Sequence, residues 1–324
     1  MANMHDEFKE YLEKIRLTSA KRTKLKDSRN ANRDRIKKHF QEVLKREIPR
    51  FHGQGSYSMH TNLNPLVGEY DIDDGVYLQG LGTDQNQWPT AETVHCWIVD
   101  AVEYATSEPP TDKSRCVRVR YADDYHIDLP IYAMNANAVP MLFEKGKNPY
   151  ESDPRAFTEW FNKQVLEKGT QLKPIVRYLK GWRDYKGGGA KIASGLALTI
   201  LASEQFCAHV YDDEALVRTV QKIVTHVEYS RYIYKPVKPY EDLTQNWTDE
   251  QRQNFLEQLK NLRDRGQDAL DEEDRSTASG IWRKLLGERF PEVRDLPESG
   301  SSSGGVAIKT SVPTMIPTGS ARSA

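Results

Sequence analysis

The chain has 324 residues, of which 38% are hydrophobic and 29% are charged, a composition typical of a globular protein with a sizeable core. Its 46 basic and 47 acidic residues give a formal net charge of -1, so no overall charge attracts the protein to nucleic acid or to an anionic membrane. The cysteines Cys96, Cys116 and Cys207 form no C-x-x-C pair, which argues against disulfides and structural zinc, and we expect buried thiols. No apolar stretch approaches the length of a membrane span, and we expect a cytoplasmic protein.

Residues 1–50 are expected to be helical. There is neither glycine nor proline between positions 5 and 48, and apolar residues recur at helical spacing. The pattern predicts two helices, or one long broken helix, with Thr18 or Ser19 capping the second. Basic residues are concentrated in positions 21–38, and this stretch is either a solvated helix face or a surface for RNA or phosphate.

Residues 51–132 change to short segments rich in β-branched and aromatic residues, which predicts a compact sheet. We expect strands at positions 73–78, 93–98, 116–121 and 126–132. In the third strand Arg118 and Arg120 alternate with valines, so the arginines lie on one face and the valines on the other. Asp123 and Asp124 predict a tight turn into the fourth strand, which completes a hairpin.

From Pro154 onward the helical period returns. Helices are expected near positions 154–165, 175–182, 192–206, 212–229, 249–266 and 275–290. The segment 192–206 is apolar almost all round, which indicates a buried helix, and Thr248 with Gln251 forms a capping signal for the next-to-last helix. Residues 297–324 are dominated by Ser, Gly, Thr and Pro, and we expect a disordered tail there.

The candidate chemistry lies in three acidic residues of the predicted sheet. Asp71 and Asp73 point to the same face of a strand because side chains alternate, while Ile72 enters the core. Asp128, on a neighbouring strand, supplies a third carboxylate, and the three oxygen ligands suit Mg²⁺. His126 shares the face of Asp128, so it either contacts the substrate or hydrogen-bonds a carboxylate, and we expect the supporting role.

Two Mg²⁺ ions held by three carboxylates can serve a phosphoryl transfer, one activating the attacking hydroxyl and the other neutralising the departing pyrophosphate. Asp128 is the best placed of the three to take the proton. Upstream, Gly55 and Ser56 permit close approach of a phosphate to the backbone and offer it a hydroxyl. This ordered set is typical of the polymerase-β-like nucleotidyltransferases.

Longer motifs narrow the resemblance. The chain contains, in order, QGSY, EYDIDDGVYL, HIDLPIYAM, SDPRAFTEWF, VRYLKGWRDYKGGG and IASGLALTILASE. These motifs resemble those of the bacterial cGAS/DncV-like nucleotidyltransferases (CD-NTases) of antiphage CBASS systems, and above all those of the DncV type. The likeness runs from about Phe51 to Glu204.

The resemblance implies an α+β fold, with a polymerase-β-like nucleotidyltransferase core at 51–150 and a helical lobe at 151–296. The helices of residues 1–50 would brace both lobes, and the tail would occupy 297–324. It also implies a Mg²⁺-dependent enzyme, using two ions with Mn²⁺ as a substitute, that makes a cyclic di- or trinucleotide from ATP and GTP. The expected product is 3',3'-cyclic GMP-AMP, a second messenger of antiviral defence.

Carried over residue by residue, the resemblance makes Asp71, Asp73 and Asp128 the catalytic metal ligands. Its candidate nucleotide-binding residues are Gln54, Gly55, Ser56, Tyr57, Lys180, Ser194, and Arg118 or Arg120. In some antiphage operons an E1/E2-like partner conjugates the C-terminus of such an enzyme, which makes Ala324 a candidate conjugation site. A downstream effector would bind the product and not this chain.

Two other functions remain open. The first is a template-independent nucleotidyltransferase that acts on RNA ends or makes linear oligonucleotides, for which positions 21–38 are the candidate groove, although nucleic acid is not an expected partner. The second is an inactive nucleotide-binding scaffold, which the three mutually repelling carboxylates disfavour. Tyr232 and Tyr234 are candidates to stack on a base at the mouth of the cleft.

Overall fold

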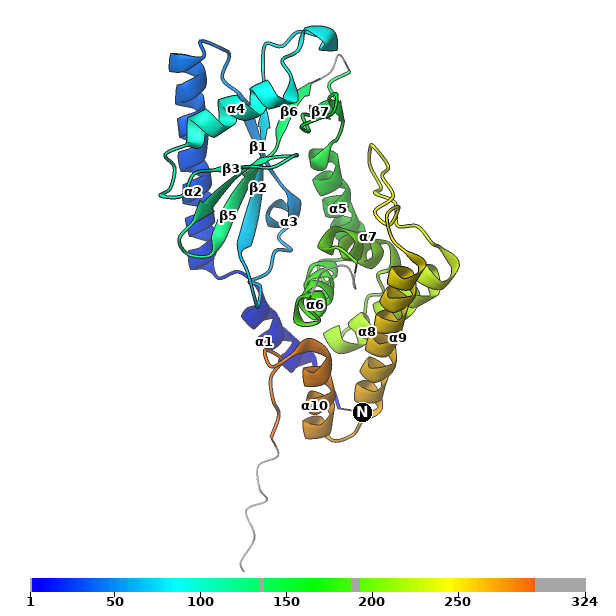
Figure 1. Cartoon of the computed structure of the whole chain (residues 1–324). Helices are drawn as coiled ribbons and strands as arrows, with labels where there is room; N and C mark the ends of the chain where they lie inside the picture. Colours follow the sequence, from blue (N-terminus) through cyan, green and yellow to red (C-terminus); the bar gives the residue numbers. More distant parts are fainter. Residues whose placement is uncertain (1, 135–136, 188–192, 295–324) are drawn as a thin grey trace, which may run out of the picture. The chain divides into compact units, whose positions relative to one another are not determined.

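Two N-terminal helices open the computed structural model, α1 (His5–Ile15) and α2 (Ser19–Lys38), and a π-helical turn, η1 (His39–Val43), follows. The structure describes residues 2–134, 137–187 and 193–294 (Figure 1). The predicted tail at 297–324, with Ala324, lies outside them. In the described part of the chain, no helix is long and apolar enough to cross a membrane.

The two N-terminal helices belong to different hydrophobic cores. Thr18 caps α2 by accepting a hydrogen bond from the backbone N–H of Lys21 at 3.2 Å, which confirms the predicted break. Phe8 of α1 is buried in the core of the C-terminal helices. Leu25 and Ile36 of α2 are buried in the core beneath the sheet, so this segment contacts both halves of the chain.

A mixed sheet follows. Its strands are β1 (Arg50–Gln54), β2 (Tyr70–Tyr77), β3 (Thr111–Asp112), β4 (Val117–Tyr121), β5 (Tyr125–Leu129), β6 (Ile131–Met134), β7 (Pro140–Leu142) and β8 (Tyr150–Glu151). The strand order is β3-β4-β5-β2-β6-β7-β8, with β1 paired to β2. β2 runs parallel to β5 and β6, whereas the other pairs are antiparallel. The central strand therefore has three neighbours.

The predicted hairpin is present as β4 and β5. Val119 pairs with Ile127 and both side chains are buried, while Arg118 and Arg120 lie on the opposite, partly exposed face. Asp124 turns the chain with a φ of 53°. The expected strand 126–132 is divided at Pro130, because proline offers no N–H to a ladder.

The predicted strand at 93–98 is wrong, since these residues lie in the helix α4 (Ala91–Val102). Thr90 caps the helix by accepting from the backbone N–H of Thr93 at 3.2 Å, and Val94, Ile98 and Val102 bury one helical face against the sheet. Helical spacing and the cap thus outweigh β-branched composition. Cys96, expected to be buried, lies exposed on the outer face of this helix.

The C-terminal half is helical, as predicted. Its helices are α5 (Pro154–Lys168), α6 (Leu172–Tyr185), α7 (Gly195–Gln205), α8 (Asp212–Tyr229), α9 (Asp249–Asp271) and α10 (Arg275–Leu286). Every residue of α7 from Ala197 to Ser203 is buried, which confirms the prediction of an apolar central helix. Thr248 and Gln251 form the predicted capping box of α9.

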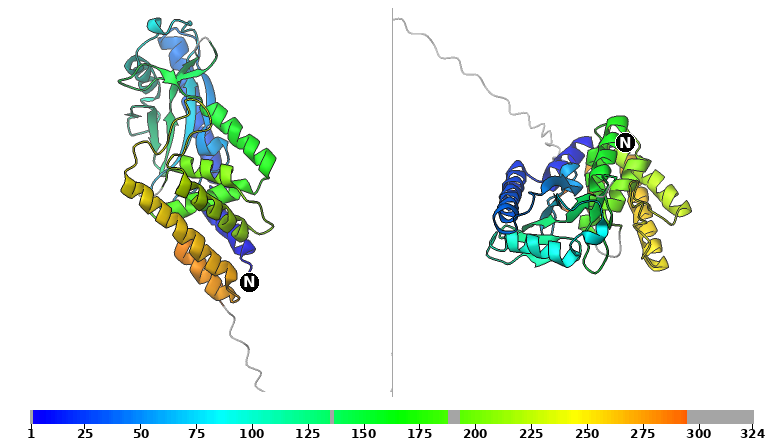
Figure 2. Two further views of the ribbon diagram at one scale, coloured as in Figure 1. Left: turned by 90° about the vertical axis from the view of Figure 1, so that its right-hand side faces the viewer. Right: turned by 90° about the horizontal axis from the view of Figure 1, so that it is seen from above.

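The helical half lies beside the sheet on the side opposite to α2 and α4 (Figures 1 and 2). Two short elements complete the chain: a single helical turn, α3 (Gly55–Ser58), after β1 and a 3₁₀ turn, η2 (Gln85–Gln87), before α4. The predicted α+β fold class is confirmed, and α3, β2, β5 and α6 carry most of the site residues.

Candidate active site

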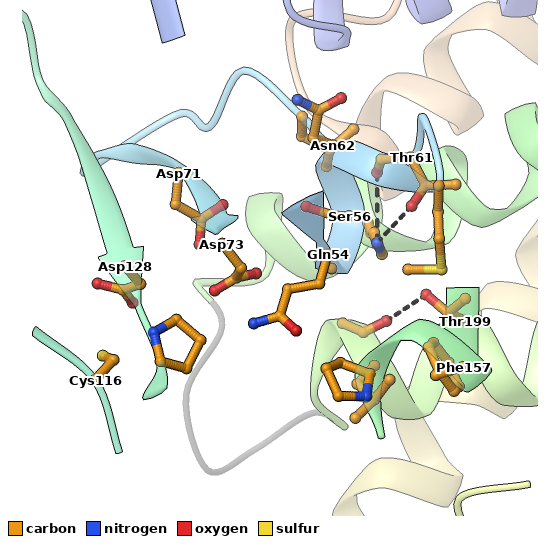
Figure 3. Close-up of a pocket in the computed structure, with 18 of the residues that line it drawn as sticks. Gln54, Ser56, Thr61, Asn62, Asp71, Asp73, Cys116, Asp128, Phe157 and Thr199 are labelled. Carbon is orange, nitrogen blue, oxygen red and sulfur yellow. Dashed lines mark hydrogen bonds between the residues drawn. The ribbon is translucent and has the colours of Figure 1, made fainter. Parts of the chain in front are cut away.

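The three predicted carboxylates lie together on β2 and β5. The parallel register pairs Asp73 with Asp128 and Asp71 with His126, while Ile72 is fully buried behind them. All three aspartates line one cavity of about 690 Å³ (Figure 3), a size within the range of about 300–1,000 Å³ that is typical of ligand pockets. The predicted alternation of β2 is confirmed.

The carboxylates crowd one another. Burial raises the pKa of Asp73 well above its usual range, and the negative charges of Asp71 and Asp128 raise it further. The cluster therefore favours a bound cation or a proton, which is a common property of functional sites.

Arg118 binds Asp128 with both arms of its guanidinium. Its Nε donates to Oδ1 and its Nη2 to Oδ2, each at 2.6 Å, and this bond raises the pKa of Arg118. Arg120, on the same strand face, donates to Thr111 Oγ1 at 2.9 Å and lies 3.3 Å from a carboxylate oxygen of Glu69. Both arginines thus contact protein groups, and neither lines the cavity.

His126 connects the carboxylates to Glu69, which the sequence reasoning missed. Its Nδ1 lies 2.6 Å from Glu69 Oε2, and its Nε2 lies 3.9 Å from both Asp71 Oδ2 and Asp128 Oδ2. The histidine lies between acidic groups on three sides, which fits a supporting role. Glu69 lies two residues before Asp71, just ahead of β2. This strand-like spacing could have indicated that Glu69 shares the face of the carboxylates.

The carboxylate oxygens of the cavity are suited to Mg²⁺. Asp71 and Asp73 offer hard oxygen ligands at the wall of the cavity, whereas both oxygens of Asp128 face Arg118. Accordingly, no group of three His, Cys, Asp or Glu side chains within the described residues is arranged around a metal position. Mg²⁺ in nucleotide enzymes is usually held by one or two carboxylates and by substrate phosphates, so the residues fit this ion.

Gly55 and Ser56 open α3 beside the carboxylates. Gly55 has a φ of 66°, and a Cβ built on it would lie 2.2 Å from Asp73 Oδ2, so no larger residue fits there. Ser56 and Gln54 also line the cavity, and Gln54 donates to the hydroxyl of Tyr132 at 3.5 Å. Tyr57 does not line it.

Lys180 reaches the same cavity from α6. Its ammonium donates to Thr61 Oγ1 at 3.1 Å and to Thr61 O at 3.4 Å, and burial lowers its pKa to about 8. Ser194 instead caps α7 by accepting from the backbone N–H of Ala197 at 3.1 Å, and its neighbour Gly195 lines the cavity in its place. The predicted nucleotide contact of Ser194 therefore stays a prediction.

Further cavity residues escaped the sequence reasoning because they come from distant connections. Cys116 lies beside Asp128, and burial raises the pKa of its thiol to about 12, so it is a neutral wall group. Arg115 and Lys235 add positive charge to the lining. Lys235 follows Tyr234, an exposed residue that does not line the cavity.

Part of this chain is similar to known proteins. Residues 49–132 match the family model described as "Cyclic GMP-AMP synthase DncV-like, nucleotidyltransferase domain". A c-di-GMP synthase of Roseivirga ehrenbergii is 23% identical over 250 residues, which are 66% of this chain and 66% of that protein. A cyclic GMP-AMP synthase of Vibrio cholerae is 24% identical over 242 residues, which are 58% of this chain and 55% of that protein. The chain thus spans less than two thirds of the length of these relatives.

Solved structures show the same fold. The Vibrio cholerae DncV cyclic AMP-GMP synthase in complex with nonhydrolyzable GTP superposes with a TM-score of 0.76 at 20% identity, covering 90% of this chain and 97% of that one. Its complex with the linear intermediate 5' pppA(3',5')pG superposes with a TM-score of 0.75 at 20% identity, covering 89% and 97%. The fold is that of a polymerase-β-like nucleotidyltransferase with a helical lobe. Residues 49–132 therefore match a DncV-like nucleotidyltransferase domain, and the chain as a whole shares the fold of the solved DncV structures.

Proposed function

We propose that this chain is a Mg²⁺-dependent cyclic oligonucleotide synthase that uses ATP and GTP, with 3',3'-cyclic GMP-AMP as the expected product. The observation that carries the proposal is that Asp71 and Asp73 share one cavity with Ser56 and Lys180. Acidic groups for a cation and polar groups for a polyphosphate therefore face the same space. The activities named for the Roseivirga and Vibrio relatives support the same reaction class.

In this mechanism the polyphosphate of the donor nucleotide lies between the Ser56 hydroxyl and the Lys180 ammonium, and Gly55 leaves room for it. Asp71 and Asp73 would hold the metal, and Asp128 would contribute once its pair with Arg118 opens. Bound Mg²⁺ supplies the positive charge that neutralises the leaving pyrophosphate and acidifies the attacking hydroxyl. Mn²⁺, another ion suited to oxygen ligands, serves as a substitute.

The acceptor 3'-oxygen forms a bond to the α-phosphorus of the donor. The bond from that phosphorus to the oxygen that bridges it to the β-phosphorus breaks, and pyrophosphate leaves with this oxygen. The proton of the hydroxyl passes to Asp128. The Arg118 guanidinium lies 2.6 Å from both oxygens of Asp128 and makes this carboxylate a weaker base. The proton transfer therefore requires the Arg118–Asp128 pair to open. A second transfer within the linear product closes the ring.

We place the product in antiphage signalling, where a downstream effector binds it. Conjugation of Ala324 by an E1/E2-like partner is part of the proposal, although this residue lies outside the described part of the chain. Deletion of the last residues should abolish a covalent adduct formed with that partner. A wild-type chain that forms no adduct in its presence contradicts the conjugation proposal.

The experiment incubates the full chain with labelled ATP and GTP and Mg²⁺, then treats the products with phosphatase and with a nuclease specific for linear 3'–5' linkages. A resistant product identified by mass spectrometry supports a cyclase. A product that the nuclease degrades supports the linear-oligonucleotide alternative, and no product from any nucleotide pair supports the scaffold alternative. Asp73→Asn should abolish product and remain folded, whereas Asp34→Asn, on the exposed side of α2, should leave turnover unchanged.

A further inference from the structure

The loop between α3 and β2 joins the two halves of the candidate site. Its residues 61–69, here called loop 61–69, run from three residues after α3 to the residue before β2, and so connect Ser56 to Asp71. Thr61, Asn62 and Glu69 are among its residues that line the cavity. The loop therefore forms the part of the cavity wall that lies between α3 and the β2 carboxylates.

Helix α6 holds loop 61–69 at two points. Lys180 donates to Thr61, and Asp184 Oδ2 accepts from the backbone N–H of Leu66 at 2.8 Å. Because Lys180 and Asp184 are four residues apart, they lie on one face of the helix. One helical face of the C-terminal half thus fixes both the start and the middle of the loop.

Arg289 adds a third contact from the segment that follows α10. Its Nη2 donates to Asp184 Oδ2 at 2.8 Å and its Nη1 donates to the backbone carbonyl of Asn64 at 2.6 Å. The two side chains are only 16% and 21% exposed, so solvent screens this ion pair weakly. One guanidinium therefore links Asp184 to the backbone of the loop.

The segment that carries Arg289 is itself anchored. Phe290 is fully buried among the core aromatics, and its carbonyl accepts from Arg283 Nη1 at 2.7 Å. Ser279 Oγ donates to the carbonyl of Pro291 at 2.8 Å. This segment lies outside the residues that match the family model, so that match assigns it no role.

We propose that Asp184 and Arg289 are positioning residues for nucleotidyl transfer. They act through loop 61–69 by holding Thr61 and Asn62 in the wall of the cavity, next to Lys180 and the space that a bound triphosphate would occupy. A displacement of about 1 Å in such a site can cost about 100-fold in rate. The inference rests on the proposed function and deepens it.

The test compares Arg289→Ala, Arg289→Lys and Asp184→Asn with Arg218→Ala, which removes an exposed pair with Glu214 on α8. The measurements are kcat and KM for nucleotide, hydrogen–deuterium exchange of peptides covering loop 61–69, and the unfolding temperature. Arg289→Ala should lower kcat at least about tenfold, change KM less, and speed exchange in the loop. Arg289→Lys should restore part of kcat, because lysine keeps the charge but loses the forked geometry.

Asp184→Asn should behave like Arg289→Ala, and the double variant should lose less than the product of the two single losses, because both changes break one junction. Turnover of Arg289→Ala equal to that of Arg218→Ala, or unchanged exchange in loop 61–69, overturns the proposal. A loss of kcat that simply follows the fraction of unfolded protein also overturns it. If the wild-type chain makes no product, the proposed function is refuted instead. Hydrogen–deuterium exchange of loop 61–69 in the variants then still tests the contacts of Asp184 and Arg289 with the loop.

Discussion

Arg118 forms two hydrogen bonds to the carboxylate of Asp128, which lines the cavity, and both donor–acceptor distances are 2.6 Å. The side chains are 18% and 14% exposed. The residue that we assign as proton acceptor and metal ligand is therefore neutralised by an arginine in this structure. Metal binding and this pair compete for the same two oxygens.

Removal of Arg118 tests this competition. Arg118→Gln leaves Asp128 without its partner, and we expect the unfolding free energy without Mg²⁺ to fall by about 2 kcal/mol, less than for a fully buried pair. Added Mg²⁺ should then raise the unfolding temperature more than it does for the wild type, because Asp128 is free to bind it. Thermal unfolding with and without Mg²⁺ measures both effects. Arg120→Gln is the matched control, and an identical Mg²⁺ response in Arg118→Gln and wild type contradicts the prediction.

The close approach of Gly55 to Asp73 predicts a large effect of one methyl group. In Gly55→Ala the new Cβ meets Asp73 Oδ2, so the carboxylate or the turn must move, and we expect product formation to fall at least about 100-fold. Gly82→Ala is the control for backbone strain, since Gly82 has a φ of 71° and open space around its Cβ position. The rate of product formation separates the two variants. Equal losses in both would assign the effect to strain alone.

The lowered pKa of Lys180, about 8, predicts a pH dependence of nucleotide binding. The lysine is charged below this pH and neutral above it, so the polyphosphate contact weakens as the pH rises through about 8. We expect kcat/KM, which reports the free enzyme, to fall over that window. Lys180→Arg should remove this decline because arginine stays charged, and Lys180→Met should give a low, flat profile. A decline that persists in Lys180→Arg would assign the pH dependence to another group.

The same pKa also predicts an effect on stability. The folded-state pKa lies below the usual value of about 10.4, so the unfolded chain binds more protons between the two values and stability rises with pH there. Lys180→Met should therefore raise the unfolding temperature at pH 7. Lys186→Met, at the end of α6, is the control, and a lower unfolding temperature for Lys180→Met contradicts the argument.

Arg33 and Asp74 are expected to stabilise the fold. Asp74 is fully buried on β2, and Arg33 of α2 donates to it through Nε at 2.7 Å and Nη2 at 2.5 Å. Arg33→Ala leaves a buried carboxylate unpaired and should lower the unfolding free energy by about 3–5 kcal/mol. Chemical denaturation measures the loss, and Arg35→Ala, on the exposed face of α2, should change it little. Adding Asp74→Asn to Arg33→Ala should recover part of the loss, and a failure to do so argues against an unpaired charge as its cause.

Local patterns were sufficient for much of the fold. The alternation of Val117 and Val119 predicted β4, and the capping pair Thr248 and Gln251 predicted the start of α9, because both signals depend on neighbouring residues. The strand prediction at 93–98 failed because a short run that contains β-branched residues fits the period of a helix as well as that of a strand. Burial of one helical face against the sheet decides between them. The sequence also did not show which basic residues of α2 have buried partners. Arg33 binds the buried carboxylate of Asp74, whereas Lys37 pairs with Asp34 on the surface.

By itself, the sequence determined that Asp71 and Asp73 share a strand face and that a third acid follows, because strand alternation is local. Only the tertiary structure decided what these side chains meet: Asp128 faces Arg118, and Lys180 reaches Thr61 across 119 positions of the chain. The role of Arg289 emerged only from the folded chain, since its partners Asn64 and Asp184 are distant in sequence. Such contacts depend on how helices and sheet pack, and no local period encodes them.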